Sequence, residues 1–158
     1  MYKIKLDNLT GTEILGLLQE HLEDMKKTSP PESKHALDLS GLKDSSVKFW
    51  TIWDDSKLAG CGAFKQLDTD HAEIKSMRTT SNYKNKGVAS QLLMFIVEQA
   101  KLSGYKTLSL ETGAMDYFVP AHRLYQKHGF SFCAPFSDYK QDSNSKFMSL
   151  SLIDEVVT

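Results

Sequence analysis

A polar, basic turn with one glycine lies between two regularly patterned segments in the middle of the chain, from Ala72 to Leu93. Ala72 to Thr79 has the pattern of a strand, and the apolar residues after Gly87 recur with the period of a helix. The first residues of a helix present unpaired backbone N–H groups and the positive end of the helix dipole, and a glycine lets an anion approach the main chain closely. The turn is therefore predicted to bind a phosphate or diphosphate group.

Two widespread phosphate-binding patterns do not occur in the sequence. A Walker loop requires G-x-x-x-x-G-K-[ST], and a dinucleotide-binding fingerprint requires G-x-G-x-x-G after a strand. The spacing found here, with Gly87 and the small residue Ala89 two positions later, suits a single diphosphate lying over one helix end.

Two segments resemble motifs of the GNAT superfamily of N-acyltransferases. Lys84 to Ala89 resembles the acyl-CoA pyrophosphate loop of that family, whose pattern is Arg or Gln, two residues, Gly, one residue, and Gly or Ala. Gly87 and Ala89 match this pattern, whereas Lys84 replaces the usual Arg or Gln. Ala121 to Phe130 resembles the later motif A-x-x-L-Y-x-x-x-G-F, at the expected distance from the loop. Three shorter segments are similar to a bacterial subgroup, the YsnE-like acetyltransferases: His21 to Met25, Ser29 to Ser33 and Lys75 to Thr79.

The alternation and period of the apolar residues predict the elements that position these motifs. Strands are predicted at Tyr2–Leu6, Val47–Trp53, Leu58–Leu67, Ala72–Thr79 and Thr107–Glu111, before Cys133, and at Ser145–Ile153. Helices are predicted after the capping box Thr10–Glu13, as a helix or turn through His35–Leu42, at Gly87–Ser103 and at Pro120–His128. The order strand, helix, strand around Gly87 implies a parallel pair with a right-handed crossover.

The resemblance implies the GNAT fold, an α/β arrangement that forms one domain over residues 1–158. Its central sheet is mixed and mostly antiparallel, with a splayed parallel pair, and is flanked by about four helices. Ile74 and Met77 are three positions apart, so both cannot lie on one face of a regular strand, and a β-bulge between them is predicted. In the family, such a bulge splays this strand from the next and makes the slot where pantetheine lies.

Transfer of an acetyl group from a thioester to an amine needs a base for the amine, a donor to the oxyanion and a proton for the thiolate. Glu73, in an Ala-Glu-Ile sequence, resembles the general base of some GNAT enzymes. The alternative for Glu73 is an ion-paired strand residue, with Lys75 on the same face. Tyr125 is the candidate acid because a phenol is protonated at neutral pH, and its alternative is a core tyrosine.

The resemblance implies the remaining site residues by position. The residues expected to bind acetyl-CoA are Met77, Arg78 and Thr79 of the strand, Lys84, Asn85, Lys86, Gly87, Val88, Ala89 and Ser90 of the loop, and Tyr125. The candidates for the acceptor pocket are His21, Glu32, Trp50, Tyr117 and Phe118. An aromatic pocket of this kind suits a small or amino-acid-like amine.

Composition narrows the classes of partner. A net charge of −1 with 41% hydrophobic residues is ordinary for a globular protein and gives no reason to expect nucleic acid. No apolar stretch approaches the roughly 20 residues that span a bilayer, so no membrane partner is expected, and a cytoplasmic location is. The histidines and the two cysteines show no metal-ligand spacing, so no metal is expected and the thiols are expected to be reduced.

The sequence therefore predicts an N-acetyltransferase that uses acetyl-CoA and a small-molecule amine, with a homodimer left open. One alternative is a non-catalytic module that binds or senses acyl-CoA, and another is an enzyme that acetylates a protein or peptide amine. Tyr125 favours catalysis, because a pure binding module has no need of an acid.

Overall fold

A computed structural model describes residues 2–28 and 39–153 of the chain. The strands are β1 (Tyr2–Leu6), β2 (Val47–Asp54), β3 (Lys57–Gln66), β4 (His71–Thr79), β5 (Thr107–Gly113), β6 (Ser131–Cys133) and β7 (Ser145–Ser151). The helices are α1 (Thr12–Thr28), α2 (Leu39–Leu42), α3 (Val88–Leu102) and α4 (Val119–Lys127), with short 3₁₀ turns η2 (Ser81–Tyr83) and η3 (Asp116–Phe118). The predicted elements are confirmed where they lie within the described residues, and most of their bounds shift by one or two residues.

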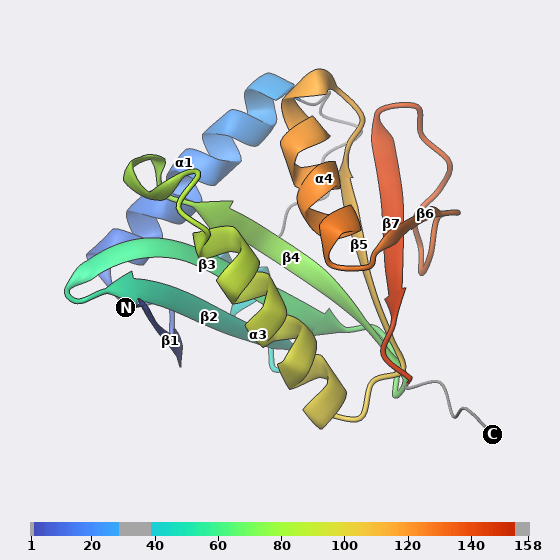
Figure 1. Cartoon of the computed structure of the whole chain (residues 1–158), viewed down its shortest axis with the longest axis horizontal. Helices are drawn as coiled ribbons and strands as arrows, with labels where there is room; N and C mark the ends of the chain where they lie inside the picture. The colour runs from blue at the N-terminus through green and yellow to red at the C-terminus, as the bar shows by residue number, and fades with distance from the viewer. Residues whose placement is uncertain (1, 29–38, 154–158) are drawn as a thin grey trace.

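The strands form one seven-stranded sheet in the order β1-β2-β3-β4-β5-β7-β6. Every pair is antiparallel except β4 and β5, which α3 joins as the crossover helix. The predicted mixed sheet with one parallel pair is therefore confirmed, and the arrangement is the one that the resemblance implies (Figure 1). Of the predicted helix or turn through His35–Leu42, only Leu39–Leu42 lies within the described residues, and it is helical.

Helix α3 covers one face of the sheet because its apolar residues lie on a single stripe. Its buried residues are Val88, Leu92, Leu93, Ile96 and Ala100, the same five that the helical period selects in the sequence. They pack with Ile52, Phe64, Ile74 and Leu108 of the strands in the larger core cluster. Tyr125 and Phe130, at and after α4, belong to that cluster too, so α3 and α4 share this face (Figure 1).

Helices α1 and α2 cover the other face of the sheet. Ile14, Leu17 and Leu18 of α1 and Leu42 of α2 pack on Phe49 of β2 and on Cys61 and Ala63 of β3. Phe49 and Trp50 are neighbours in β2, and the alternation of a strand sends Phe49 toward α1 and Trp50 toward α3. Among the described helices, none is both long and apolar enough to cross a membrane.

The bulge predicted between Ile74 and Met77 is present in β4. Ala63 of β3 pairs with Lys75 and Cys61 pairs with Arg78, so Ser76 and Met77 together face the single residue Gly62. Ser76 has a positive φ of 58°. Gly62 permits the bulge because a Cβ there would lie 2.3 Å from Met77 Sδ and 2.9 Å from Ile96 Cδ1.

Candidate active site

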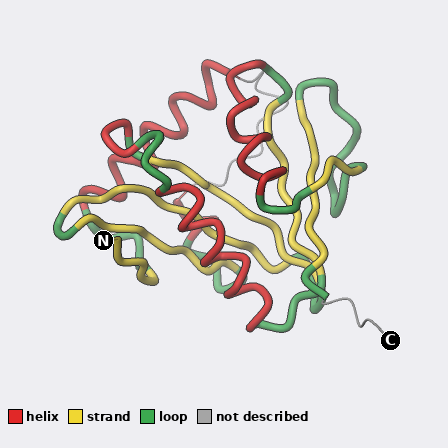
Figure 2. The backbone as a smooth tube through the Cα atoms, viewed as in Figure 1, coloured by secondary structure: helices red, strands yellow, loops and turns green. Residues whose placement is uncertain are grey.

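The site lies where β4 and β5 separate. The two strands pair only from His71 to Glu73 and from Thr107 to Ser109. Beyond this point the bulge bends β4 away, while β5 stays paired with β7 along its whole length. Figures 1 and 2 show β4 and β5 together at one end and apart at the other. Between them is a cavity of about 130 Å³, lined by residues of β4, β5, α1, α4 and η3 and by Tyr139.

The glycine loop before α3 has the open backbone that an anion site requires. Asn85 and Gly87 have positive φ angles of 62° and 80°. Gly87 is the N-cap of α3 and provides no side-chain hydrogen bond, so the first backbone N–H groups of the helix are left for a ligand. A Cβ at Gly87 would meet nothing within 4 Å, which means that glycine is required here by the backbone angle and not by crowding.

The two motifs recognised in the sequence are in direct contact. His128 Nε2 lies 3.1 Å from Ser90 Oγ and shares a hydrogen bond with it, which joins the end of α4 to the first turn of α3. Burial, and secondarily Lys127, lower the pKa of His128 below its usual value, which favours the neutral imidazole at this junction. The start of α3, which follows the glycine loop, and the end of α4 are therefore held next to each other.

Tyr125 projects from α4 into the cleft between the strands. Its side chain lines the 130 Å³ cavity, and only 6% of the residue is exposed. Its ring packs edge-to-face on Phe130 at 5.5 Å. Burial raises the pKa of the phenol, so the hydroxyl is protonated throughout the neutral range and can donate a hydrogen bond.

Glu73 is buried beneath Lys75 and Tyr139. Only 3% of Glu73 is exposed, and Lys75 Nζ lies 3.1 Å from Glu73 Oε2. The hydroxyl of Tyr139 donates a hydrogen bond to the same carboxylate oxygen and accepts one from Lys75 Nζ at 2.9 Å. Glu73 thus lines the cleft as an ion-paired carboxylate, and the expected position of Lys75 on the same face is confirmed.

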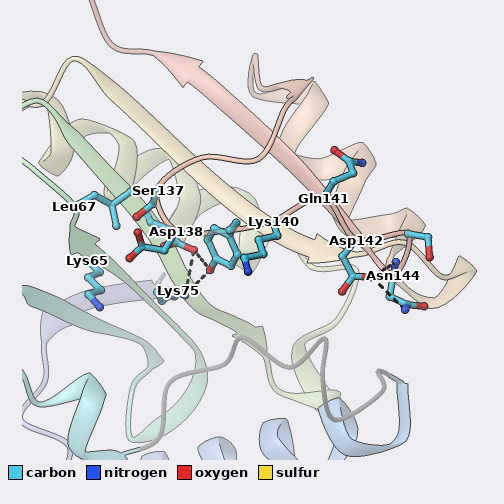
Figure 3. A pocket seen from close by; sticks show the side chains of 12 residues that line it. Lys65, Leu67, Lys75, Ser137, Asp138, Lys140, Gln141, Asp142 and Asn144 are labelled. Carbon is cyan, nitrogen blue, oxygen red and sulfur yellow. Dashed lines mark hydrogen bonds and ion pairs between the residues drawn. The ribbon is translucent and has the colours of Figure 1, made fainter.

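Tyr139 belongs to the segment between β6 and β7, which the sequence pattern does not connect with the site. Phe136 of this segment packs on the His71 ring at 5.5 Å and on Phe147 at 5.8 Å, so the segment lies back over the sheet. A second hollow lies beside it, with Lys65 and Lys75 on the strand side and Ser137 to Asn144 on the other (Figure 3).

Glu111 is a second carboxylate in the cleft and was not predicted. It lies on β5, lines the same cavity as Glu73 and Tyr125, and accepts a hydrogen bond from Ser145 Oγ at 2.8 Å. Burial raises the pKa of Glu111 to about 7. The only sequence signal for it is a charged residue in the apolar strand that follows α3, and this signal does not reveal which face the carboxylate occupies.

Arg78 connects β4 to α1 beside the cleft. Its guanidinium Nη2 lies 2.6 Å from Glu20 Oε1 and 2.6 Å from Asp24 Oδ2. The guanidinium is therefore held against α1 through Nη2, while its buried Nε has no hydrogen-bond partner among the described residues. His21, one residue from Glu20, lines the cleft, and burial with the nearby Arg78 lowers its pKa to about 4.

The other predicted residues fall in different places. Met77 and Phe118 line the cleft, and Phe118 fits there because Gly113 has no side chain; a Cβ would lie 2.0 Å from its ring. Tyr117 is 53% exposed on η3. Trp50 is buried in the core against Phe64 and Phe95, on the α3 face and away from the cleft. Glu32 lies outside the described residues.

Comparisons with known proteins agree with this geometry. The sequence model of the Acetyltransferase (GNAT) family matches residues 14–130. The chain belongs to this family and is a GNAT-family N-acetyltransferase. It is 52% identical over 149 residues to the uncharacterized N-acetyltransferase YsnE of Bacillus subtilis (strain 168), an alignment that covers 94% of this chain and 99% of YsnE. The resemblance to YsnE-like acetyltransferases is confirmed.

Two solved structures illustrate the fold. A protein of Klebsiella pneumoniae, named as an acyl-CoA N-acyltransferase, superimposes with a TM-score of 0.81 at 27% identity, over 97% of this chain and 99% of the other. A Bacillus subtilis acetyltransferase in complex with CoA superimposes with a TM-score of 0.71 at 21% identity, over 97% of this chain and 100% of the other. The second likeness concerns the fold alone.

Proposed function

We propose that this protein transfers the acetyl group of acetyl-CoA directly to the amine of a small molecule. The observation that carries the proposal is the arrangement of three features: the open helix start at Gly87, the separation of β4 from β5, and the phenol of Tyr125. Tyr125 lines the cavity where the strands separate, and the end of its helix is hydrogen-bonded to the first turn of α3 through His128 and Ser90. A thioester cofactor with a diphosphate at one end needs these three features in this order.

The loop before α3 binds the diphosphate. The backbone N–H groups at the start of α3 and the positive end of its dipole favour a doubly charged anion. The loop residues are those predicted from the sequence: Lys84, Asn85, Lys86, Gly87, Val88, Ala89 and Ser90. Lys86 Nζ lies over the Tyr83 ring at 5.5 Å, which holds this cation beside the loop.

The separated part of β4 holds the acyl end of the cofactor. From Met77 to Thr79 the strand has no partner on the β5 side among the described strands, so its backbone groups on that side are available to the amide-containing arm of CoA and to the thioester oxygen. A backbone N–H aimed at the thioester carbonyl stabilises the oxyanion that forms when the amine attacks. Tyr125 then donates a proton to the sulfur as the C–S bond breaks.

A small acceptor is favoured by the size of the cleft. The cavity next to the reacting position is about 130 Å³, and it shares Glu73, Lys75 and Tyr139 with the adjoining hollow of about 760 Å³. Pockets for small molecules are roughly 300–1,000 Å³. Tyr139 and the segment around it close the acceptor side above Glu73. The carboxylates Glu73 and Glu111 both line the cavity, so a cationic amine is attracted there.

The test is a measurement of CoA release by the purified protein with acetyl-CoA and a panel of acceptors. The panel contains small primary amines, amino acids, and peptides with a free N-terminus or lysine. We expect release with one or more small amines and none with peptides. Release with peptides alone would overturn the small-molecule acceptor, and acetyl-CoA binding without release on any acceptor would identify a sensing module instead.

A further inference from the structure

The cleft contains two carboxylates on opposite walls, and their surroundings differ. Glu73 is on β4 and Glu111 is on β5, the two strands that diverge to form the cavity. A pair of acids whose environments separate their proton affinities commonly divides the acid–base work of an active site. The question is which of the two takes the proton of the amine.

The carboxylate of Glu73 is already engaged by two neighbours. It is buried, ion-paired with Lys75 at 3.1 Å and hydrogen-bonded by the hydroxyl of Tyr139. An amine that used Glu73 as its base would have to disrupt these buried contacts, which opposes the transfer.

The surroundings of Glu111 differ from those of Glu73 in the charge of the hydrogen-bond donor. Among the described residues, Glu111 accepts a hydrogen bond from the neutral hydroxyl of Ser145 on β7. The charged groups that act on it are Lys75 and Glu73 of β4 and Asp142 before β7, and the two acids oppose the effect of the lysine. Among the described residues, Tyr125 of α4, His21 of α1 and Tyr139 are the other titratable groups that line the same cavity.

This setting gives Glu111 a proton affinity suited to catalysis near neutral pH. Burial is the largest influence and raises its pKa to about 7. A general base is most effective when its pKa lies close to the working pH, because it is then largely ionised and still a strong proton acceptor.

We propose that Glu111 accepts the proton of the incoming amine, and that Glu73, ion-paired with Lys75 and hydrogen-bonded by Tyr139, is a positioning residue. The role rests on the proposed function. Glu111 takes one proton from the ammonium, and the freed amine attacks the thioester carbonyl to form the C–N bond. As the C–S bond breaks, the departing thiolate takes the proton of Tyr125, and the second proton of the nitrogen passes through water to the Tyr125 phenolate, which restores the hydroxyl. Glu111 then releases its proton to solvent, so one proton is produced for each amide formed.

The experiment compares the pH profiles of kcat/KM for the parent protein, Glu111→Gln and Glu73→Gln, with an amine that the parent accepts. The kcat/KM of the parent should fall below about pH 7, where Glu111 becomes protonated; this fall is the acid limb of the profile. In Glu111→Gln this limb should disappear, and kcat/KM should fall by roughly 10²-fold or more at neutral pH. The residual rate should rise about tenfold per pH unit up to the pKa of the amine, because only the free amine reacts. Glu73→Gln should lower the rate but keep the limb.

Ser145→Ala provides a measurement that would not change if Glu111 had only a structural role. The Ser145 hydroxyl donates to the Glu111 carboxylate and so stabilises its charged form. Without it, the acid limb should move to higher pH by about half a unit to one unit. The acetyl-CoA Kd of each variant, measured by calorimetry, shows whether the cofactor site is intact.

The outcomes separate this role from the proposed function. An active protein whose acid limb survives in Glu111→Gln, or stays in place in Ser145→Ala, would assign the proton transfer to another group and leave the proposed function standing. Loss of the limb in Glu73→Gln instead would make Glu73 the base. A parent that binds acetyl-CoA but acetylates no amine would overturn the proposed function and this role together.

Discussion

Replacing Gly87 by alanine separates its contribution to cofactor binding from its contribution to the fold, because the chain offers a matched control. Gly87 and Gly104 flank the two ends of α3, with φ angles of 80° and 89°. A Cβ at either position would meet nothing within 4 Å. The two substitutions therefore impose the same backbone strain without a clash, and only one of them lies at the proposed diphosphate site.

The structural cost of each substitution is small and should be equal. A residue with a side chain is destabilised by roughly 1–2 kcal/mol in the left-handed region of backbone angles. Alanine offsets part of this cost because it lowers the conformational entropy of the unfolded chain. A net loss of about 1 kcal/mol lowers the melting temperature of a chain of this size by about 2–4 °C. Both variants should thus remain folded and melt a few degrees below the parent.

The effect on acetyl-CoA binding should differ sharply between the two variants. At a ligand concentration of about 100 times the parent Kd, binding stabilises the parent by about 2.7 kcal/mol. A methyl group at Gly87 occupies the space through which the diphosphate approaches the helix start, and a tenfold weaker Kd reduces the stabilisation to about 1.4 kcal/mol. The upward shift in melting temperature should therefore be halved in Gly87→Ala and unchanged in Gly104→Ala.

The assay is thermal denaturation followed by fluorescence, with and without acetyl-CoA, for the parent and both variants. Calorimetry then gives the three Kd values directly. If Gly87→Ala and Gly104→Ala show the same acetyl-CoA shift, the diphosphate is not held at the start of α3, and the proposed path of the cofactor along the cleft is wrong.

Three further predictions follow from the same cleft. Tyr125→Phe keeps the ring packing and removes the hydroxyl, so kcat should fall by about 10²- to 10⁴-fold while the acetyl-CoA Kd changes little; a kcat within about twofold of the parent would reduce Tyr125 to packing. Burial raises the pKa of Glu111 from 4.5 to about 7, so ionisation of its carboxyl group destabilises the folded protein as the pH rises through this range. The melting temperature of Glu111→Gln should therefore lie above that of the parent at pH 8 and equal it at pH 4. Glu73→Gln, which removes the carboxylate from its buried ion pair with Lys75, should melt lower than the parent at pH 8. A change of the same sign in both variants would contradict the assigned environments. Arg78→Gln should cost about 1–2 kcal/mol at neutral pH. Because Arg78 holds the pKa of Asp24 below its ordinary 3.8, denaturation curves should show this loss shrinking as the pH falls below that value, and a pH-independent loss would assign the effect to packing.

The elements and the cofactor loop could be predicted from the sequence because local patterns determine them. The stripe from Val88 to Ala100 specifies a helix that covers one face of a sheet, and that stripe is buried as expected. The three-residue spacing of Ile74 and Met77 indicated the bulge, which is present. These features depend on residues close together in the chain, where periodicity and turn chemistry are informative.

The acceptor side of the cleft could not be predicted in the same way. Tyr139 reaches Glu73 across 66 positions of sequence, from a segment with no periodic pattern, and nothing local signals the contact. Alternation in β2 shows that Phe49 and Trp50 face opposite ways, but it does not show which face α3 covers. Trp50 was therefore expected near the acceptor, whereas it packs in the core. Glu111 depends likewise on burial that only the assembled cleft provides.

The early separation of β4 and β5 also determines where the unpaired strand edges of the sheet lie. An unpaired strand edge on a protein surface invites pairing with another molecule, and proteins usually keep such edges short. Here β6 at one end of the sheet extends only from Ser131 to Cys133, whereas the longer unpaired edges, after Glu73 on β4 and after Ser109 on β5, face each other in the interior. Tyr125 and Tyr139 line the space between them. A flexible chain of amide groups is narrow enough to enter that space, but a strand that belongs to another folded protein is not. The unpaired backbone groups of β4 and β5 can therefore bind a cofactor without pairing with a strand of another molecule.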